Sequence, residues 1–283
     1  MSVRLVNAGG RAGLCVGGSV VDVERRAAGR FSSDPMDALA RWDEFRDWAE
    51  GVRAGSGDPA QDEFALGPCV PRPAKVFGIG LNYRAHAAEA GLDLPKQPLV
   101  FTKFPNCLAG PRADVVLTSE RVDYEVELVA VIGRRARNIA DSRALEHVAG
   151  YCVGQDISDR ALQFADKPPQ FSLGKSADTF GPIGPALVSL DAFADPDDLP
   201  LWCEVSGERL QQDRTRDMIF SVAELVAYLA RYCTLEPGDL IFSGTPAGVG
   251  SAREPRRYLL PGDEIASGID GIGILRNRCV KSG

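Results

Sequence analysis

Residues 123–132 read DYEVELVAVI, and this stretch predicts both a buried strand and a chemical site. Its composition is that of a strand buried on both faces, except for Glu125 and Glu127. Because successive side chains of a strand point to opposite faces, the two carboxylates share one face. That face continues with Val129 and Val131, so the acids point into an apolar interior, where a carboxylate must be paired or bound to a cation. A divalent metal ion is the simplest compensation.

A third acidic residue strengthens the metal hypothesis. Ser142 is placed to cap a short helix that runs to Val148, and residues 151–155 then read as a strand that ends at Asp156. Three carboxylates without a neighbouring Cys or His suit a hard cation, Mg²⁺ or Mn²⁺, better than zinc or iron. The alternative is that the two glutamates line a solvated sheet face while Asp156 caps a turn.

Composition indicates an ordinary globular protein. The 283-residue chain is 45% hydrophobic and 25% charged, and it is long enough to bury a large core. A net charge of -7 without a dense Lys/Arg stripe argues against a nucleic-acid partner. The seven cysteines are scattered and form no C-x-x-C pair, which favours reduced thiols in a cytoplasmic protein. Neither a signal-peptide pattern nor an apolar run of membrane length is found, so no membrane association is expected.

Turn-forming residues divide the chain into two parts. A polar linker at 53–63 follows a small N-terminal module, and the chemical motifs all lie after it. We expect residues 1–70 to form a small N-terminal domain with its linker and residues 71–283 the main domain. The elements predicted in the N-terminal module are strands at 3–6, 14–16 and 20–23 and a helix at 36–52.

One helix in the main domain is clearly delimited. Ser221 and Glu224 form a capping box at the start of a predicted helix over 221–233, whose apolar residues share one face. We expect this helix to be purely structural, with a strand at 240–243 after it.

A second cluster of residues that can transfer protons follows the glycine-rich end of a predicted strand. Residues 78–89 read GIGLNYRAHAAE, in which a strand through Val76 ends at glycines and a helical turn follows. The turn places His86 and Glu89 at i and i+3, side by side on one face. An imidazole can take a proton from water near neutral pH, and a carboxylate can fix its tautomer. The alternative role is a helix-face ion pair, whereas His147, the other histidine, lacks such a neighbour and is expected at the surface.

Spacing excludes several common sites. Gly78 and Gly80 are followed by Tyr83 where a dinucleotide fingerprint needs a glycine, and residues 244–250 lack the Lys-Ser/Thr of a phosphate-binding loop. No G-x-S-x-G elbow occurs, so a serine hydrolase of that type is unsupported.

Six segments, spread over the region from about residue 71 to residue 274, together resemble the fumarylacetoacetate hydrolase superfamily. They occur in the order found in that family, which makes chance agreement negligible. The segments are GLNYRAHAAE at 80–89, PLVFTK at 98–103, DYEVEL at 123–128, QDISDR at 155–160, GKSADTFGP at 174–182 and SGTPAGVG at 243–250.

The resemblance implies a fold, a cofactor and roles for individual residues. The expected fold is α+β and mostly β, a mixed β-sandwich roll with a small N-terminal α/β domain, usually assembled as a homodimer. Mg²⁺ or Mn²⁺ would be bound by Glu125, Glu127 and Asp156. Proton transfer from water is assigned to His86 and Glu89, and contact with the carboxylate or enolate of the substrate to Lys175. The residues implied to bind substrate are Asn82, Tyr83, Arg84, Gln163 and Thr245.

The resemblance also implies a class of reaction. Residues 175–185 and 258–263 look most like the subgroup that contains 2,4-diketo-3-deoxy sugar acid hydrolases and proteins named as ureidoglycolate lyases. Gln155 departs from many members, which have a small residue or Asn before the metal-binding Asp. The expected reaction is hydrolysis of the C–C bond of a 2,4-dioxo acid, an acylpyruvate or a diketo-deoxy sugar acid, by water that His86 deprotonates. The products are pyruvate or a related 2-oxo acid and a carboxylic acid.

Two other interpretations remain open at this point. The same residues fit a decarboxylase or lyase of an oxaloacetate-like acid, or an isomerase or hydratase of a 2-oxo acid, because all of these proceed through an enolate. The His86 and Glu89 pair favours hydrolysis, since decarboxylation has less use for a base that acts on water. A non-catalytic metabolite-binding protein is opposed by the presence of the three acids, the pair and Lys175 in one chain.

Overall fold

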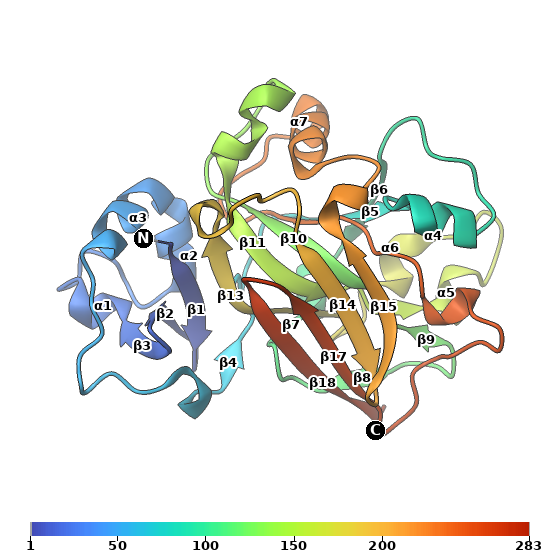
Figure 1. Cartoon of the computed structure of the whole chain (residues 1–283), viewed down its shortest axis with the longest axis horizontal. Coiled ribbons are helices and arrows are strands. Elements are labelled where there is room, and N and C mark those ends of the chain that lie inside the picture. Colours follow the sequence, from blue (N-terminus) through green and yellow to red (C-terminus); the bar gives the residue numbers. More distant parts are fainter. Residues whose placement is uncertain (1, 283) are drawn as a thin grey trace.

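The computed structural model describes residues 2–282 and is built mainly of β-sheets with short helices at their edges (Figure 1). The large sheet has the strand order β3-β2-β1-β13-β11-β10-β16-β5-β6, and β4 and β7 pair with β1 and β13. Its strands, in that order, are Ser19–Asp22, Arg11–Val16, Arg4–Ala8, Gly181–Ser189, Val148–Gln155, Val126–Ile132, Leu240–Phe242, Val76–Gly80 and Leu99–Lys103, with β4 at Leu66–Gly67 and β7 at Leu108–Ala109.

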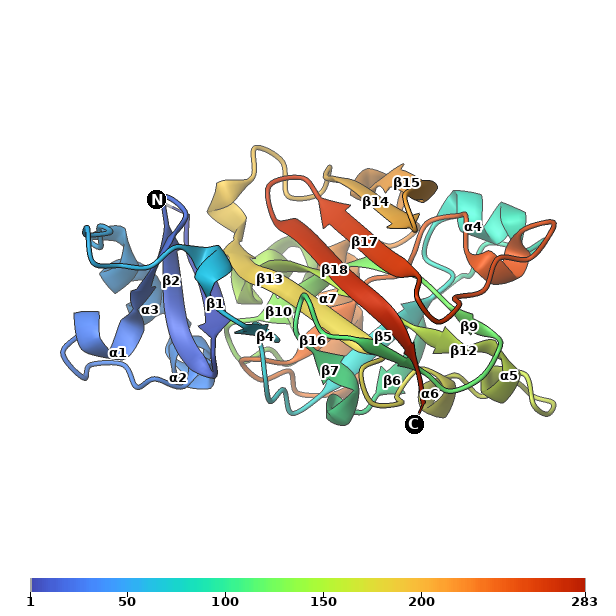
Figure 2. The same ribbon diagram turned by 90° about the horizontal axis from the view of Figure 1, so that it is seen from below.

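A five-stranded sheet packs face to face on the large one (Figures 1 and 2). Leu128 and Val153 of the large sheet share one buried cluster with Leu201 and Ile265 of the smaller sheet. This confirms the predicted α+β sandwich that is mostly β. The smaller sheet runs β15 (Glu208–Arg214), β14 (Pro200–Val205), β17 (Glu264–Ile269), β18 (Gly273–Lys281), β8 (Val115–Leu117), and a separate ribbon pairs β12 (Ser158–Asp159) with β9 (Val122–Asp123).

The helices are short and lie around the sheets (Figure 1). The helix predicted to start at Ser221 is confirmed as α7, where Ser221 and Glu224 make the reciprocal hydrogen bonds of a capping box. The α-helices are α1 (Val23–Arg26), α2 (Pro35–Ala40), α3 (Trp42–Glu50), α4 (Arg84–Glu89), α5 (Arg160–Gln163), α6 (Phe171–Gly174) and α7 (Val222–Tyr232). The 3₁₀ turns are Gln61–Glu63, Pro105–Cys107, Asp141–His147, Leu190–Ala192, Thr215–Asp217 and Gly250–Ala252.

The single helix predicted at 36–52 is wrong, because the chain forms α2 and α3 with a break at Arg41. The apolar residues of this region recur every three positions, whereas a helix turns once in 3.6 residues. On one continuous helix these residues would therefore lie progressively around the helix instead of on one face. The break at Arg41 allows the apolar residues of the next helix to face the core again. After the break, Trp42 and Phe45 are buried, and Phe45 packs edge-to-face on Phe31 with ring centroids 5.3 Å apart.

Two other predicted elements also differ from the structure. The helix predicted over 142–148 is a 3₁₀ turn at Asp141–His147, and the strand after it begins at Val148 instead of Tyr151. The strand predicted over 123–132 is divided into β9 and β10 at residues 124 and 125. The break lies beside the predicted metal ligands.

The N-terminal strands extend the large sheet, since β1 pairs with β13 through Leu5 and Leu187. One apolar cluster includes Leu5 and Phe45 as well as Val129 and Phe242, so it reaches from the N-terminal module to the central strands. The boundary at residue 70 stays a prediction. No helix within residues 2–282 has the length and apolar character needed to cross a membrane.

Candidate metal centre and active site

The three predicted metal ligands meet where β10 begins and β11 ends. Glu127 lies on β10, Glu125 immediately before it and Asp156 immediately after β11. Carboxylate oxygens of the three side chains lie within 4.8 Å of one another. The three residues are at most 6% exposed, which contradicts the alternative that the glutamates line a solvated face. The pattern of alternating acids thus marks a buried carboxylate cluster.

Two lysines compensate part of this charge. Lys175 Nζ donates to Glu125 Oε2 and Asp156 Oδ2, each at 2.7 Å, and to Ser158 Oγ at 2.8 Å. Lys103 Nζ donates to the other oxygen of Asp156, also at 2.7 Å. Burial lowers the pKa of Lys175, but the charges of Asp156 and Glu125 outweigh burial and raise it above its usual value. Lys175 is therefore held as an ammonium ion inside the cluster.

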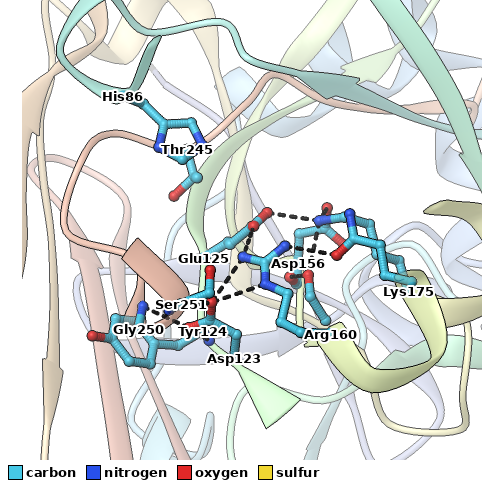
Figure 3. A network of polar contacts seen from close by, with 12 residues as sticks. His86, Asp123, Tyr124, Glu125, Asp156, Arg160, Lys175, Thr245, Gly250 and Ser251 are labelled. Atoms are coloured by element: carbon cyan, nitrogen blue, oxygen red, sulfur yellow. Dashed lines mark hydrogen bonds and ion pairs between the residues drawn. The ribbon is translucent and has the colours of Figure 1, made fainter. Parts of the chain in front are cut away.

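Arg160 connects the acid cluster to a fourth carboxylate, that of Asp123, as Figure 3 shows. Its guanidinium donates to Glu125 Oε1 at 2.5 Å and, through Nε, to Asp123 Oδ2 at 2.9 Å. Asp123 also accepts the backbone N–H groups of Gly250 and Ser251, at 2.7 and 3.0 Å. Burial would raise the pKa of Glu125, yet Lys175 and Arg160 together bring it below its usual value. Glu125 is thus ionised and fixed by two cations.

Glu127 has no such compensation. Its carboxylate accepts one hydrogen bond, from Gly244 N–H at 2.8 Å, and forms no ion pair with any residue in the described part of the chain. Burial and the negative charges of Asp156 and Glu125 raise the pKa of Glu127 well above its usual value. A cation shared by the three acids would remove this repulsion.

The donor set fits a hard divalent cation. All three ligands offer carboxylate oxygen, the donor that Mg²⁺ and Mn²⁺ prefer, and no thiol or imidazole belongs to the cluster. With every group ionised, the buried carboxylates exceed the cationic side chains by one charge. The carboxylates are those of Asp123, Glu125, Glu127 and Asp156, and the cationic side chains are Lys103, Arg160 and Lys175.

The predicted histidine–glutamate pair forms on α4. His86 Nδ1 lies 3.1 Å from Glu89 Oε2, and the two side chains are 16% and 21% exposed. Glu89 Oε1 accepts the backbone N–H of Gly248 at 2.9 Å, which holds the carboxylate in place. Figure 3 shows His86 projecting from α4 toward Glu125. Burial raises the pKa of Glu125, and His86 is, after Lys175 and Arg160, one of the groups that lower it. His147, by contrast, is remote from the cluster and contacts the backbone oxygen of Arg135.

Three further predicted residues precede α4 or begin it. Asn82 is fully buried, and its amide bonds the backbone of Phe220 and Ser243, so its side chain ties loops together. Arg84 donates to the backbone oxygens of residues 217 and 218. Tyr83 differs from both, because its buried hydroxyl has no hydrogen-bond partner among the described residues. Burial, followed by the charge of Glu127, raises the pKa of Tyr83 well above its usual value.

The other two predicted pocket residues each have a side-chain oxygen engaged with the protein. Gln163 Oε1 accepts a hydrogen bond from Arg160 at 2.9 Å. The Thr245 hydroxyl donates to Val126 O at 2.9 Å and accepts from Gln211 at 2.8 Å. Of the five residues expected to bind substrate, Tyr83 is therefore the one whose side-chain polar group is left without a partner.

Sequence reasoning missed three residues of the cluster. Lys103, Ser158 and Arg160 each contact one of the acids or Lys175, but none was assigned a role. All three lie within the quoted segments 98–103 and 155–160. A buried group of carboxylates requires nearby cations, so the basic residues of those segments could have been identified as candidates.

Comparisons of sequence and structure relate this chain to known proteins. The model of the fumarylacetoacetate (FAA) hydrolase C-terminal family matches residues 75–280. A protein from Mycobacterium smegmatis provisionally named HpcE is 47% identical, with a TM-score of 0.94 over 99% of this chain and 100% of that one. A protein from Mycobacterium abscessus provisionally named 2-hydroxyhepta-2,4-diene-1,7-dioate isomerase is 29% identical, with a TM-score of 0.86 and complete coverage of both chains.

A third solved structure carries ligands. Maleylpyruvate hydrolase from Sphingobium sp. SYK-6, in complex with manganese(II) and pyruvate, is 27% identical, with a TM-score of 0.83 over 100% of both chains. The family match covers well over half of the chain and includes the acid cluster, Lys175 and the His86–Glu89 pair. The chain belongs to the fumarylacetoacetate hydrolase superfamily.

Proposed function

We propose that the protein is a divalent-metal-dependent hydrolase that cleaves the C–C bond of a 2,4-dioxo acid, an acylpyruvate or a 2,4-diketo-3-deoxy sugar acid. The observation that carries the proposal is that His86, which is paired with Glu89, projects toward Glu125 of the buried cluster of three carboxylates. A base that is oriented by a carboxylate and directed at a cation site is the arrangement needed to activate water beside a polarised carbonyl group.

Charge balance supports an anionic substrate. Mg²⁺ or Mn²⁺ held by Glu125, Glu127 and Asp156 would polarise the substrate oxygens that it contacts. With every group ionised, the buried groups carry one excess negative charge, so a bound divalent cation would change the net charge of the site to plus one. A 2-oxo carboxylate brings one negative charge and neutralises it. The related maleylpyruvate hydrolase binds manganese and pyruvate, which is a 2-oxo acid.

Lys175 is proposed to stabilise the negative charge that develops on the leaving 2-oxo acid. Its three N–H donors are occupied by Glu125, Asp156 and Ser158. A cation held by Glu125 and Asp156 would compete with Lys175 for these carboxylates, and a donor released in this way would be free for the substrate. A released ammonium donor inside a buried site is a strong partner for an enolate oxygen.

Water activation is proposed for His86. Its Nδ1 faces Glu89, which Gly248 N–H holds from the other side, and this leaves Nε2 to take the proton. The hydroxide attacks the C4 carbonyl carbon, the C3–C4 bond breaks, and its electron pair stays on C3 as the enolate. C3 then takes a proton, so one water and one dioxo acid give a carboxylic acid and a 2-oxo acid. The unpartnered hydroxyl of Tyr83 is proposed to donate to the substrate.

An isomerase is the second candidate, because three of the similar solved structures bear isomerase names. An isomerase moves a proton between carbon atoms of the substrate and consumes no water. Decarboxylation of an oxaloacetate-like acid likewise passes through an enolate without an attacking water. The products therefore distinguish the three reactions.

The test is an assay of acylpyruvates and related 2-oxo acids with Mg²⁺ or Mn²⁺, in which pyruvate, the carboxylic acid and CO₂ are measured separately. Equal amounts of 2-oxo acid and carboxylic acid, abolished in Glu127→Gln and retained in the control His147→Ala, would support the proposal. CO₂ release or an isomer of unchanged mass would contradict it.

The family resemblance also suggests a homodimer, and one surface suits a partner copy. β6 is an edge strand of the large sheet, α6 lies beside it, and α5 packs against α6. Exposed apolar side chains gather on these elements: Leu99, Val100, Phe104, Leu162, Phe164, Phe171 and Leu173, each 40–60% exposed. An apolar patch of this kind on a sheet edge favours association. Light scattering should show a dimer that Leu173→Asp weakens and that the control Leu260→Asp leaves intact.

A further inference from the structure

Two buried glutamines contact the backbone beside the candidate metal ligands. We infer that Gln155 and Gln211 are positioning residues, whose side-chain amides set the spacing of the Glu125 and Glu127 carboxylates for a cation. Gln155 is 0% exposed and Gln211 is 1% exposed. The inference rests on the proposed function, because it requires a divalent ion at these acids.

The glutamines replace backbone pairing at the break between β9 and β10. Pairing of β10 with β11 starts at Val126, and pairing with β16 reaches only Val129. Gln155 Oε1 accepts the N–H of Glu125 at 2.9 Å, and Gln211 Oε1 accepts the N–H of Val126 at 3.0 Å. Two consecutive backbone donors are therefore held by side chains from two different sheets.

Each amide is also fixed at its other end. Gln155 Nε2 donates to Ser267 Oγ on β17 at 2.6 Å. Gln211 Nε2 donates to Thr245 Oγ1 at 2.8 Å and to Pro246 O at 2.9 Å. Thr245 Oγ1 then donates to Val126 O, so that the N–H and the C=O of Val126 are both tied to side chains. A buried polar network with every member bonded holds one geometry.

The geometry held in this way is that of the acid cluster. Val126 is the single residue between Glu125 and Glu127, and the two glutamine amides bond the two backbone N–H groups that flank the Cα of Glu125. Rotation of this backbone would move one carboxylate relative to the other. Groups that orient metal ligands without touching the metal typically contribute 10- to 100-fold to affinity.

The test uses Gln155→Met and Gln211→Met, which keep an unbranched side chain of similar length but remove the amide. Calorimetric titration of the metal-free proteins with Mn²⁺ should show affinity weaker by roughly 10- to 100-fold in each. Gln155→Asn keeps the amide on a shorter side chain and should weaken Mn²⁺ binding less than Gln155→Met does. The matched control is Asn277→Leu, which removes a fully buried amide on β18 that bonds the backbone at Ala113. It should lower the melting temperature and leave Mn²⁺ affinity unchanged.

The outcomes separate this inference from the proposed function. If both methionine variants fold and bind Mn²⁺ with the affinity of the wild-type protein, the inference is wrong. If the wild-type protein itself does not bind Mn²⁺, the proposed metal site is wrong. If the variants do not fold, hydrogen exchange of the metal-free wild-type protein tests the inference. The backbone amides of residues 125 and 126 should be protected from exchange to the same extent as those of residues 128–131. Exchange of residues 125 and 126 at the rate of a loop would contradict the inference.

Discussion

The two chemical regions of the molecule are built differently. The acid cluster lies at the junction of central strands, is at most 6% exposed and is surrounded by three cationic side chains. The His86–Glu89 pair lies on a six-residue helix, is partly exposed and depends on one contact with Gly248. The first region suits binding in a fixed geometry, and the second suits the exchange of a proton with water. The difference indicates that metal binding and proton transfer can be impaired separately.

The largest effect is expected from Glu127→Gln, which removes the one acid that lacks a cationic partner. Activity should fall by about 10⁴-fold, because several kcal/mol of charge stabilisation depend on the metal ion. The metal-free variant should also be more stable by about 1 kcal/mol or more, since a repelled, buried charge is removed. Calorimetry should show loss of Mn²⁺ binding together with a melting temperature raised by about 2–4 °C. Retained Mn²⁺ affinity would contradict the assigned ligand set.

His86→Ala should give the complementary result. Loss of a general base typically slows a reaction by roughly 10²- to 10⁴-fold, while Mn²⁺ affinity should stay close to that of the wild-type protein. Steady-state assays at saturating metal and a parallel titration test both parts. If the variant hydrolysed acylpyruvates at the wild-type rate, His86 would be only an ion-pair partner of Glu89.

Lys175→Met should affect turnover and Mn²⁺ affinity in opposite directions, which distinguishes enolate stabilisation from metal binding. The turnover rate should fall by roughly 10²- to 10³-fold, the range for loss of one charged donor in a buried site. Mn²⁺ should bind at least as tightly as in the wild-type protein, since Lys175 no longer competes for Glu125 and Asp156. Weaker Mn²⁺ binding in a folded variant would show that Lys175 supports the metal site instead of competing with it.

The smallest effect is expected from Glu89→Gln. The amide oxygen can still accept a hydrogen bond from His86, but the amide nitrogen then faces the Gly248 N–H, and the charge that stabilises the imidazolium is lost. A fall in turnover rate of roughly tenfold is expected, comparable to the loss of one charge-assisted hydrogen bond. An effect as large as that of His86→Ala would assign Glu89 a direct part in the reaction.

Local sequence patterns predicted the central residues of the site. The residues around them are brought together by contacts between segments that are distant in the sequence. The alternation of Glu125 and Glu127 and the i, i+3 spacing of His86 and Glu89 depend only on strand and helix periodicity. The break before Val126 depends on Gln211, 85 residues away in the sequence. Likewise, Lys103 reaches Asp156 across 53 residues. Periodicity carries no information about such contacts, so the break and the roles of Lys103 and Arg160 were not predicted.

The central claim is that water is added across a C–C bond of the substrate. The most direct measurement is turnover of an acylpyruvate in ¹⁸O-labelled water with Mg²⁺ or Mn²⁺, followed by mass analysis of the carboxylic acid product. One ¹⁸O atom per carboxylic acid, with an equal amount of pyruvate and no signal in Glu127→Gln, is the predicted result. Consumption of the substrate without a labelled carboxylic acid, by CO₂ release or by isomerisation, would contradict the account.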